Sequence, residues 1–131
     1  MQDSIFTKII KGEIPSYKIY EDEKTLAFLD INPVAEGHVL VIPKVQVEFI
    51  WDLDAEDYRA LMATVKKVGL HLRQKSPKSY VGQMVIGTDV PHAHVHLIPF
   101  NQVSELKRTL DGPGAAVDSD SLAELAEKLR L

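Results

Sequence analysis

The sequence predicts one domain that contains both helices and strands, with about five strands, one long helix, a short N-terminal helix and a C-terminal helix. Three observations support this prediction. The chain has 131 residues, 45% of them hydrophobic, which suits a single domain with one core. Apolar residues recur at helical spacing over residues 58–72. Residues 91–99 instead alternate histidine and apolar residues with the period of a strand.

The N-terminal part is predicted to form a short helix followed by three strands. Asp3 or Ser4 can cap a helix over residues 5–11, and Gly12 is suited to end it. Four residues at helical spacing are expected to form the buried stripe of this helix: Ile5, Phe6, Ile9 and Ile10. The strands are expected over residues 17–21, 25–29 and 38–42, and a turn at residues 22–24 joins the first two.

The middle of the chain is predicted to contain the longest helix and two further strands. Asp54 can cap this helix, which is expected to run to about Gln74. One face of the helix carries its apolar side chains: Tyr58, Leu61, Met62, Val65, Val68 and Leu72. A strand over residues 80–86 is expected to lead through a turn at residues 87–89 into the strand that bears the histidines.

The chain changes character after Pro99. Residues 1–100 are expected to form the main domain, and residues 101–131 a flexible connection and a C-terminal helix of the same domain. Ser121 is predicted to open that helix with a capping box that includes Glu124. Its apolar residues need a surface to cover, which in a dimer could be the pocket of the partner: Leu122, Leu125 and Leu129.

The composition excludes several classes of protein. The chain has no cysteine, hence no disulfide, no thiol nucleophile and no cysteine-based zinc site. Its net charge of −4 argues against a general nucleic-acid binder. No apolar run approaches the ~20 residues of a membrane helix, and the N-terminus lacks the basic segment of a signal peptide. We therefore expect a cytoplasmic protein with no nucleic-acid and no membrane partner.

The histidines are the chemically distinctive feature of the chain, because three of the five lie within residues 91–99. On a strand, His92, His94 and His96 are expected to share one face, with neighbouring rings roughly 7 Å apart. The opposite face is expected to pack on the core through three apolar residues: Ala93, Val95 and Leu97. His38, at the start of another predicted strand, can point toward this row, whereas His71 in the long helix is expected to be structural.

Three interpretations of the histidine row are open. The row could be a solvated face of a sheet, or a zinc site with imidazole ligands. It could also perform chemistry at phosphorus, where one ring attacks while its neighbours bind phosphate or carry protons. We favour the third interpretation, because imidazole is a good nucleophile near neutral pH and Asp89 is the one carboxylate near the row.

Four blocks of the sequence resemble the histidine triad (HIT) superfamily of nucleotide hydrolases and transferases, and most of all its Hint-like branch. They are residues 5–15, residues 27–33, residues 37–44 and the histidine row with its flanking prolines. The resemblance implies an α+β fold on an antiparallel sheet of about five strands. It also implies a homodimer formed through the long helix and a central strand. We expect no cofactor and no metal in this chain.

The resemblance implies an enzyme that cleaves a purine nucleotide of the phosphoramidate type at its α-phosphorus. His94 would attack and form a covalent nucleotidyl-histidine, while His92, His96 and His38 would bind phosphate oxygens, orient the nucleophile and assist the leaving group. Two alternatives are a dinucleoside polyphosphate hydrolase and a nucleotide-binding regulatory protein with little turnover. A metal-dependent hydrolase is a further rival.

The resemblance also assigns residues to substrate binding. Four positions match those that sandwich the base: Phe6, Ile9, Phe28 and Leu29. Asp30 matches the carboxylate that holds the ribose hydroxyls, a role that suits an acceptor-only group. Without the resemblance, the four apolar residues could equally be core and Asp30 a turn residue.

The sequence departs from the family pattern at three places. Many members bind structural zinc with a Cys-x-x-Cys pair, where this chain has Ser4 and Thr7. Many place Ser or Thr three residues before the first histidine of the row, where this chain has Asp89. Thr88 could supply the phosphate-contacting hydroxyl instead. Gln83 is the candidate for the phosphate-binding amide of the Hint-like branch.

Overall fold

The computed structural model describes residues 2–131 and has an α+β fold built on one antiparallel sheet, as expected. The strand order is β1-β2-β3-β5-β4. The strands are β1 (Lys18–Glu21), β2 (Thr25–Leu29), β3 (Val39–Pro43), β4 (Tyr80–Met84) and β5 (Val95–Phe100). The helices are α1 (Ile5–Ile10), α2 (Ala55–Lys75), α3 (Val103–Lys107) and α4 (Ser119–Leu129), with short 3₁₀ turns η1 (Ile50–Asp52) and η2 (Arg108–Asp111).

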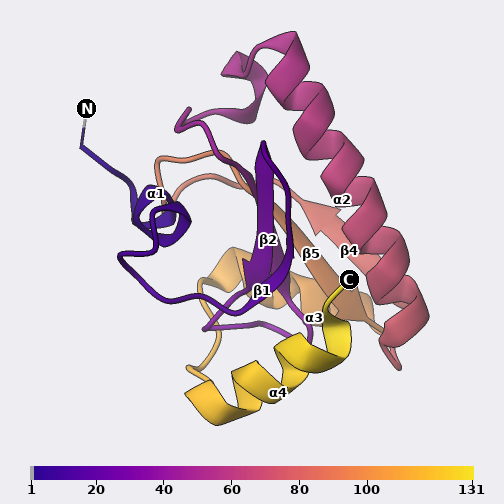
Figure 1. Cartoon of the computed structure of the whole chain (residues 1–131). Helices are drawn as coiled ribbons and strands as arrows, with labels where there is room; N and C mark the ends of the chain where they lie inside the picture. Colours follow the sequence, from indigo (N-terminus) through magenta and orange to yellow (C-terminus); the bar gives the residue numbers. More distant parts are fainter. Residues whose placement is uncertain (1) are drawn as a thin grey trace.

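The sheet has a hydrophobic layer on each face. The long helix α2 and the C-terminal helix α4 pack on one face over the larger core. The short helix α1 lies on the other side of the sheet, where it covers a smaller cluster with β2 and β3 (Figure 1). Alternation along β5 divides its side chains between these layers, which positions the histidines on the side of α1.

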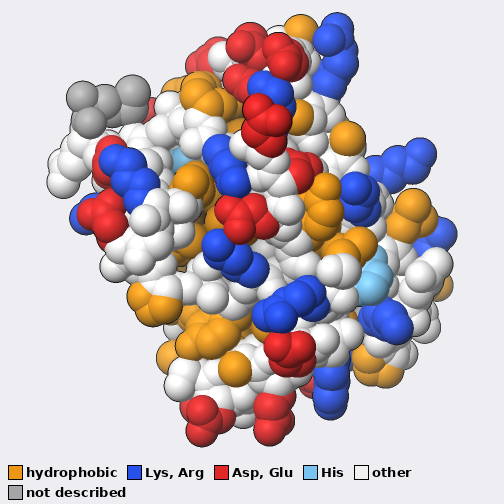
Figure 2. Space-filling view, in the orientation of Figure 1, with side chains coloured by type: hydrophobic (Ala, Val, Ile, Leu, Met, Phe, Trp, Pro, Cys, Tyr) orange, Lys and Arg blue, Asp and Glu red, His pale blue; other side chains and the backbone are white. Residues whose placement is uncertain are grey.

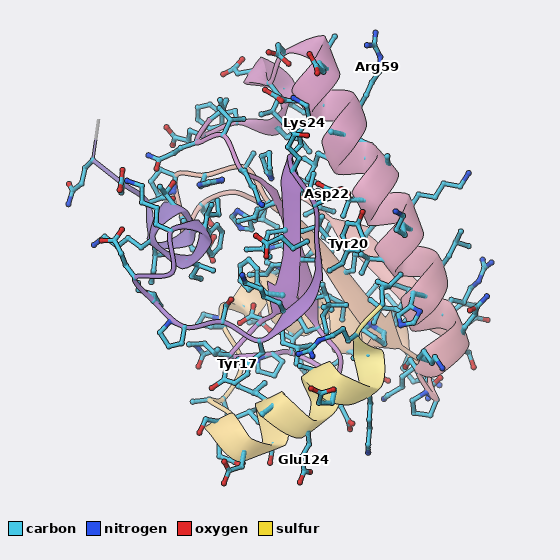
Figure 3. The ribbon with its side chains drawn as sticks, viewed as in Figure 1. Tyr17, Tyr20, Asp22, Lys24, Arg59 and Glu124 are labelled. Carbon is cyan, nitrogen blue, oxygen red and sulfur yellow. The ribbon has the colours of Figure 1, made fainter. Side chains whose placement is uncertain are left out.

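The start of α2 is fixed by a side-chain cap and by ion pairs to the turn between β1 and β2. Asp54 accepts a hydrogen bond from Asp57 N at 2.8 Å, which confirms the predicted cap. Lys24 extends from the turn toward the helix and pairs with Glu56 at 3.2 Å and Asp57 at 3.4 Å (Figure 3). Two acidic residues in the first turn also complement the positive end of the helix dipole.

The surface is mixed in charge. On the face that carries α2 and β1, basic and acidic side chains are interspersed rather than gathered into fields of one sign (Figure 2). Within residues 2–131, no helix is both long and apolar enough to span a membrane.

Two details of the predicted strands and helices were wrong. Ile5 is 50% exposed and is not part of the buried stripe of α1, which consists of Phe6 and Ile9. The strand with the histidines begins at Val95 rather than at residue 91, because residues 91–92 form a bend and residues 93–94 run outside the ladder.

The C-terminal part is more ordered than a flexible connection. Residues 102–105 form a capping box that opens α3, an element that the sequence did not indicate. The cap of α4 is Asp118, not Ser121, because the Asp118 carboxylate accepts hydrogen bonds from Ser121 N and Oγ. The helix packs on the core of its own chain through three buried residues: Leu122, Ala126 and Leu129.

A segment that we call the strap (residues 112–117) runs beside the loop after β2. Gly114 N donates to Asn32 O at 3.0 Å, and Val117 N donates to Ile31 O at 3.1 Å. A side chain at Gly114 would collide with the Pro33 carbonyl, so this close approach of two backbones requires glycine.

Candidate active site

The histidine row lies where the chain enters β5. Ala93, Val95 and Leu97 belong to the larger core, whereas the histidines contact residues on the side of α1. The rings of His94 and His96 are 5.1 Å apart between centroids, closer than the predicted ~7 Å. The prediction assumed a regular strand, and His94 lies before the ladder begins.

The geometry fixes one tautomer of His94. Its Nδ1 lies 2.7 Å from the backbone carbonyl of His92, and a carbonyl only accepts, so Nδ1 carries the hydrogen. Nε2 therefore has a free lone pair. The side chain is buried, and this nitrogen has no hydrogen-bond partner among the described residues. A buried nitrogen with an unused lone pair is suited to attack an electrophile.

A chain of hydrogen bonds likewise fixes His38 and His96. Val34 N donates to His38 Nδ1 at 3.2 Å, so the hydrogen of the neutral His38 ring is on Nε2. That Nε2 donates to His96 Nδ1 at 2.9 Å, which leaves His96 with its own hydrogen on Nε2. His38 thereby orients His96 so that its second nitrogen is a donor.

His92 has no nitrogen left for a ligand. Its Nε2 donates to Pro43 O at 2.8 Å, and its Nδ1 lies 2.8 Å from Ser4 Oγ. The ring is fully buried. The expected phosphate contact of His92 therefore finds no free ring atom, and the residue acts through its carbonyl on His94.

Burial favours the neutral form of three imidazoles of the site, those of His38, His92 and His96. Burial, together with the neighbouring His38 and His94 rings, lowers the pKa of His96 to about 4. Burial also lowers the pKa of His38, against an opposing effect of the Asp30 charge. Burial lowers the pKa of His92 as well, although the hydrogen bond to Pro43 works in the opposite direction. Neutral rings keep the lone pairs that nucleophilic and proton-accepting roles need.

A cavity of about 400 Å³ adjoins His96. Its walls contain nearly all residues that the sequence suggested for substrate binding: Phe6, Ile9, Phe28, Leu29, Asp30, Thr88 and Asp89. His38 and His96 also line it, whereas His92 and His94 do not. His94 nevertheless contacts two wall residues, because its ring centroid lies 5.1 Å from those of His96 and Phe6.

Asp89 occupies the position in front of His94. Its Oδ1 is 3.4 Å from His94 Nε2, its side chain is 69% exposed, and it lines the cavity. The carboxylate therefore lies beside the nitrogen that is proposed to attack, and its negative charge opposes the approach of an anionic group. A ligand phosphate that reaches His94 must displace Asp89, whose exposure makes that movement easy.

One group of residues has the geometry of a cation site. Asp30, His38 and His96 each offer a ligand atom, and these atoms lie within 4.8 Å of one another. Imidazole and carboxylate are ligands that zinc accepts. These atoms already interact with one another. His38 Nε2 is 2.9 Å from His96 Nδ1 and 3.7 Å from Asp30 Oδ2.

Other parts of the site were not expected. Gln83 is exposed on β4 and lines neither this cavity nor its larger neighbour, so its candidacy as the phosphate-binding amide has no geometric support. Thr109, Gly112 and Pro113 complete the cavity from the C-terminal part. The Gly-Pro-Gly sequence at residues 112–114 was the one signal for them. The hydrogen bond from Val34 N to His38 could not be predicted from the sequence, because a backbone donor does not depend on the side chain.

The comparisons with known proteins agree with this geometry. A family model described as "HIT domain" matches residues 11–103. An adenosine 5′-monophosphoramidase of Candida albicans, HNT1, is 38% identical over 135 residues, covering 96% of this chain and 88% of that protein.

Two solved structures cover almost the whole fold. A HIT-like protein from Bartonella henselae, described as involved in cell-cycle regulation and as holding an unknown ligand, has a TM-score of 0.86 at 31% identity, covering 98% of this chain and 94% of that chain. A zinc-bound histidine triad family protein from Mycobacterium smegmatis has a TM-score of 0.76 at 28% identity, covering 96% and 89%. With a family model that spans most of its length and the fold of these relatives, the chain belongs to the HIT domain family.

Proposed function

We propose that this protein hydrolyses a purine nucleoside phosphoramidate, or a closely related nucleotide, with His94 as the nucleophile at the α-phosphorus. The state of His94 carries the proposal: its Nδ1 is fixed by the His92 carbonyl, and its buried Nε2 has no hydrogen-bond partner among the described residues. Membership of the family and the likeness to HNT1, named an adenosine 5′-monophosphoramidase, support a hydrolase that acts on phosphorus-containing bonds.

The reaction takes two displacements at phosphorus. In the first, the Nε2 lone pair of His94 forms a bond to the α-phosphorus, the phosphorus–nitrogen bond of the substrate breaks, and the leaving amine takes up a proton. In the second, water attacks the phosphorus and loses a proton, and the bond to Nε2 breaks. The products are a nucleoside monophosphate and an amine, and His94 returns to its starting state.

His96 is the proton carrier in this scheme. It is neutral in the empty site, because burial lowers its pKa to about 4. The negative charge of a bound phosphate favours the protonated ring. The added proton sits on Nδ1, so the His38 Nε2–H must turn away from that nitrogen when His96 is protonated. His96 can then give its Nε2 proton to the amine and later accept one from water at the same nitrogen.

The cavity walls suit the rest of a nucleotide. Phe6 and Phe28 pack edge to face, with centroids 5.5 Å apart, and with Ile9 and Leu29 they form an apolar slot for a base. Asp30 lies at the wall beside His38 and offers a carboxylate to the ribose hydroxyls. Its Oδ1 accepts from Asn32 N at 2.8 Å, which holds the side chain in place.

The test is release of adenosine monophosphate from adenosine 5′-phosphoramidate by the wild-type protein and by His94→Ala. We expect a loss of more than roughly 10³-fold, because the covalent step is removed. The variant His71→Ala, which changes a histidine of α2 outside the site, is the matched control and should keep the wild-type rate.

Two outcomes would contradict the proposal. Retention of a tenth or more of the activity in a folded His94→Ala protein would exclude the residue as the nucleophile. Loss of activity on treatment with a chelator would favour a metal ion at Asp30, His38 and His96 instead. Acid quenching followed by mass spectrometry should find a nucleotidyl group on the peptide that contains His94.

A larger adjoining cavity favours a second candidate function. It measures about 830 Å³ and shares Asp30, His38 and Gly112 with the first cavity. A second nucleoside could lie there, so a dinucleoside polyphosphate is the alternative substrate. A kcat/KM higher for diadenosine polyphosphate than for the phosphoramidate, in the same assay, would select this alternative.

We further propose that the protein is a cytoplasmic homodimer. The absence of cysteine from the sequence suits a reducing compartment, and cell fractionation tests this location. The dimer follows from an unpaired sheet edge and has its own test below.

A further inference from the structure

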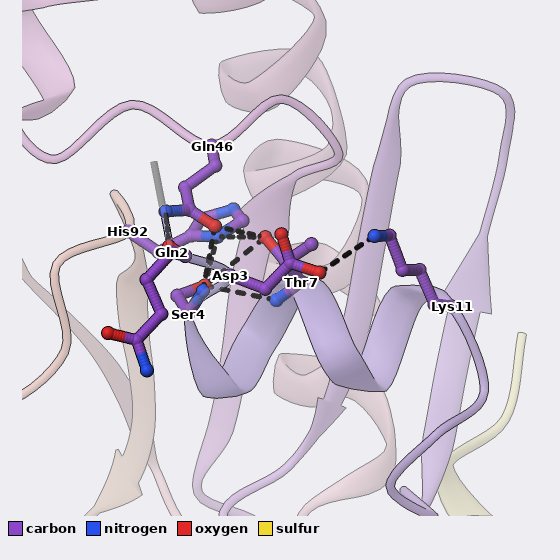
Figure 4. A network of polar contacts seen from close by, with 7 residues as sticks. All are labelled: Gln2, Asp3, Ser4, Thr7, Lys11, Gln46 and His92. Carbon is purple, nitrogen blue, oxygen red and sulfur yellow. Dashed lines mark hydrogen bonds and ion pairs between the residues drawn. The ribbon is translucent and has the colours of Figure 1, made fainter.

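A polar cluster lies on the far side of His92 from the proposed nucleophile. We call it the hydroxyl–amide cluster, and it consists of Ser4, Thr7, Gln46 and His92 (Figure 4). Ser4 comes directly before α1, Thr7 lies within α1, and Gln46 follows β3. None of these four residues lines the cavity, so the proposed chemistry leaves the cluster unexplained.

The donor of each hydrogen bond in the cluster follows from the bond between His92 Nε2 and Pro43 O. Pro43 O accepts from His92 Nε2, so His92 Nδ1 must accept, and Ser4 Oγ donates to it at 2.8 Å. Thr7 N in turn donates to Ser4 Oγ at 3.0 Å. Gln46 Oε1 accepts from Ser4 N at 2.8 Å and from Thr7 Oγ1 at 2.6 Å. The cluster therefore fixes one neutral tautomer of His92.

The backbone at His92 needs this support because the sheet does not hold it. The ladder of β5 begins at Val95, so His92 lies outside it. The segment has backbone bonds from His92 N to Val90 O at 2.8 Å and from Ala93 N to Val47 O at 2.7 Å. The other contacts of His92 with distant parts of the chain pass through its side chain, which bonds Pro43 and Ser4, lies 3.4 Å from Thr7 Oγ1 and packs edge to face on Phe6.

The position of His92 decides the state of His94. The His92 carbonyl is the acceptor for His94 Nδ1 at 2.7 Å, and this bond keeps the lone pair on Nε2. A shift of the carbonyl weakens that bond and frees His94 to rotate or to change tautomer. Misplacement of a reacting group by about 1 Å can cost 10²-fold in rate.

The cluster does not suit the structural zinc that a Cys-x-x-Cys pair binds in many family members. Its donors are two hydroxyls, an amide oxygen and one imidazole nitrogen, whereas zinc in proteins prefers thiolate and imidazole. The donors are also satisfied by one another at hydrogen-bond distances. The cluster is thus complete without a metal.

We propose that Ser4, Thr7 and Gln46 are positioning residues, which hold the His92 carbonyl in place and thereby keep His94 in its reactive tautomer. This inference rests on the proposed function of His94. The hydrogen bonds between α1 and the segment after β3 then contribute to catalysis, although none of the three residues touches the substrate.

The sharpest test compares Thr7→Val, which removes the hydroxyl at nearly constant size, with Thr7→Ser, which keeps it. We expect Thr7→Val to lower kcat roughly 10-fold or more with little change in KM, and Thr7→Ser to restore kcat. Ser4→Ala should have at least the same effect on kcat, since Ser4 contacts His92 directly. Lys11→Ala, which removes an exposed ion pair to Asp3 from the same helix, is the control without effect.

A second measurement separates positioning from general loss of stability. In ¹⁵N NMR spectra of the wild type, His92 should appear as the Nε2–H tautomer and His94 as the Nδ1–H tautomer. Thr7→Val and Ser4→Ala should convert these signals to tautomer mixtures, at temperatures where circular dichroism finds the proteins folded. Lys11→Ala should retain the wild-type signals.

The outcomes distinguish this inference from the proposed function. Wild-type kcat and single tautomers in both hydroxyl-free variants would overturn the inference while leaving the reaction intact. Failure of the wild type to turn over any nucleotide would instead refute the proposed function, and the tautomer signals would still decide whether the cluster positions His94. A stoichiometric zinc found by native mass spectrometry in the wild type and lost in Gln46→Leu would also overturn it.

Discussion

Asp89 determines the charge that an incoming phosphate meets in front of His94. Its Oδ1 is 3.4 Å from His94 Nε2, and it lines the cavity beside Thr88. The carboxylate competes with an anionic substrate for the position in front of the nucleophile. This residue therefore bears on the choice between an efficient enzyme and a nucleotide-binding protein with little turnover.

We expect Asp89→Asn to raise kcat/KM for adenosine 5′-phosphoramidate roughly 5-fold, about the 1 kcal/mol of an exposed ion pair. The amide keeps the size of the side chain and removes its charge. Steady-state kinetics at low ionic strength measure the change. Glu36→Gln, which removes a carboxylate at the larger cavity, is the control for net charge. A fall in kcat/KM for Asp89→Asn would show instead that the carboxylate assists His94.

At the scale of single residues, the sequence identified the row of histidines and the cavity walls but not all of their roles. Alternation predicted which side chains face α1, because a two-residue period does not depend on the partner strands. It could not predict that Ser4 and Pro43 occupy both nitrogens of His92, since Pro43 and His92 lie far apart in the sequence. Contacts of that kind depend on the tertiary fold.

Among the strands, β4 has an unusual position at the edge of the sheet. Within residues 2–131 it pairs with β5 alone, and it contacts α2. Tyr80 is 58% exposed and Val85, directly after the strand, 47%. The opposite edge is less available, because α4 packs on β1 and Leu131 N donates to Ile19 O at 3.1 Å. Unpaired edges with apolar side chains favour pairing with another chain.

We expect light scattering to give the wild type about twice the mass of the 14.7 kDa chain, and Val85→Lys a mass near that of one chain. Lysine on an edge opposes strand pairing by charge repulsion across the two-fold axis. Trp51→Lys changes the most exposed apolar side chain away from this edge and should remain dimeric. A monomeric Trp51→Lys protein with a dimeric Val85→Lys protein would place the interface elsewhere.

The elements themselves were predicted well where capping and periodicity are local. Asp54 and Ser4 cap their helices as expected, and β2 has its predicted bounds. α3 was missed because its sequence is short and polar, and Leu106 acquires a partner only when it meets Gly82 of β4. The cap of α4 moved to Asp118 because two sequences near the helix start could serve, and local rules do not choose between them.

For the molecule as a whole, the neutral histidines link stability to pH. The pKa values of His38, His92 and His96 all lie below the ordinary value, mainly because the rings are buried. The unfolded chain takes up protons below about pH 6.5 while the folded protein does not. The free energy of unfolding must therefore fall as the pH decreases from 7 toward 4.

We expect thermal or urea unfolding to show a loss of about 2 kcal/mol between pH 7.5 and 5 from His96 alone, since its pKa in the fold is about 4. His96→Asn should reduce this dependence by about that amount and leave the part that comes from His38 and His92. Carboxylates such as Asp22, whose pKa is lowered against the effect of burial by bonds from Lys24 and Thr25, contribute only at lower pH. Equal stability at the two pH values would contradict the inferred neutrality of the row.

The contact between the strap and the Pro33 carbonyl has a consequence for the evolution of this protein. No side chain fits at Gly114. Relatives that keep the path of the strap must therefore keep this glycine, even where the surrounding residues differ. Relatives that carry a bulkier amino acid at this position must have a different backbone path in their C-terminal segment. Their nucleotide cavities would then have lost the wall that Gly112 and Pro113 build here, and a different choice of substrate would follow.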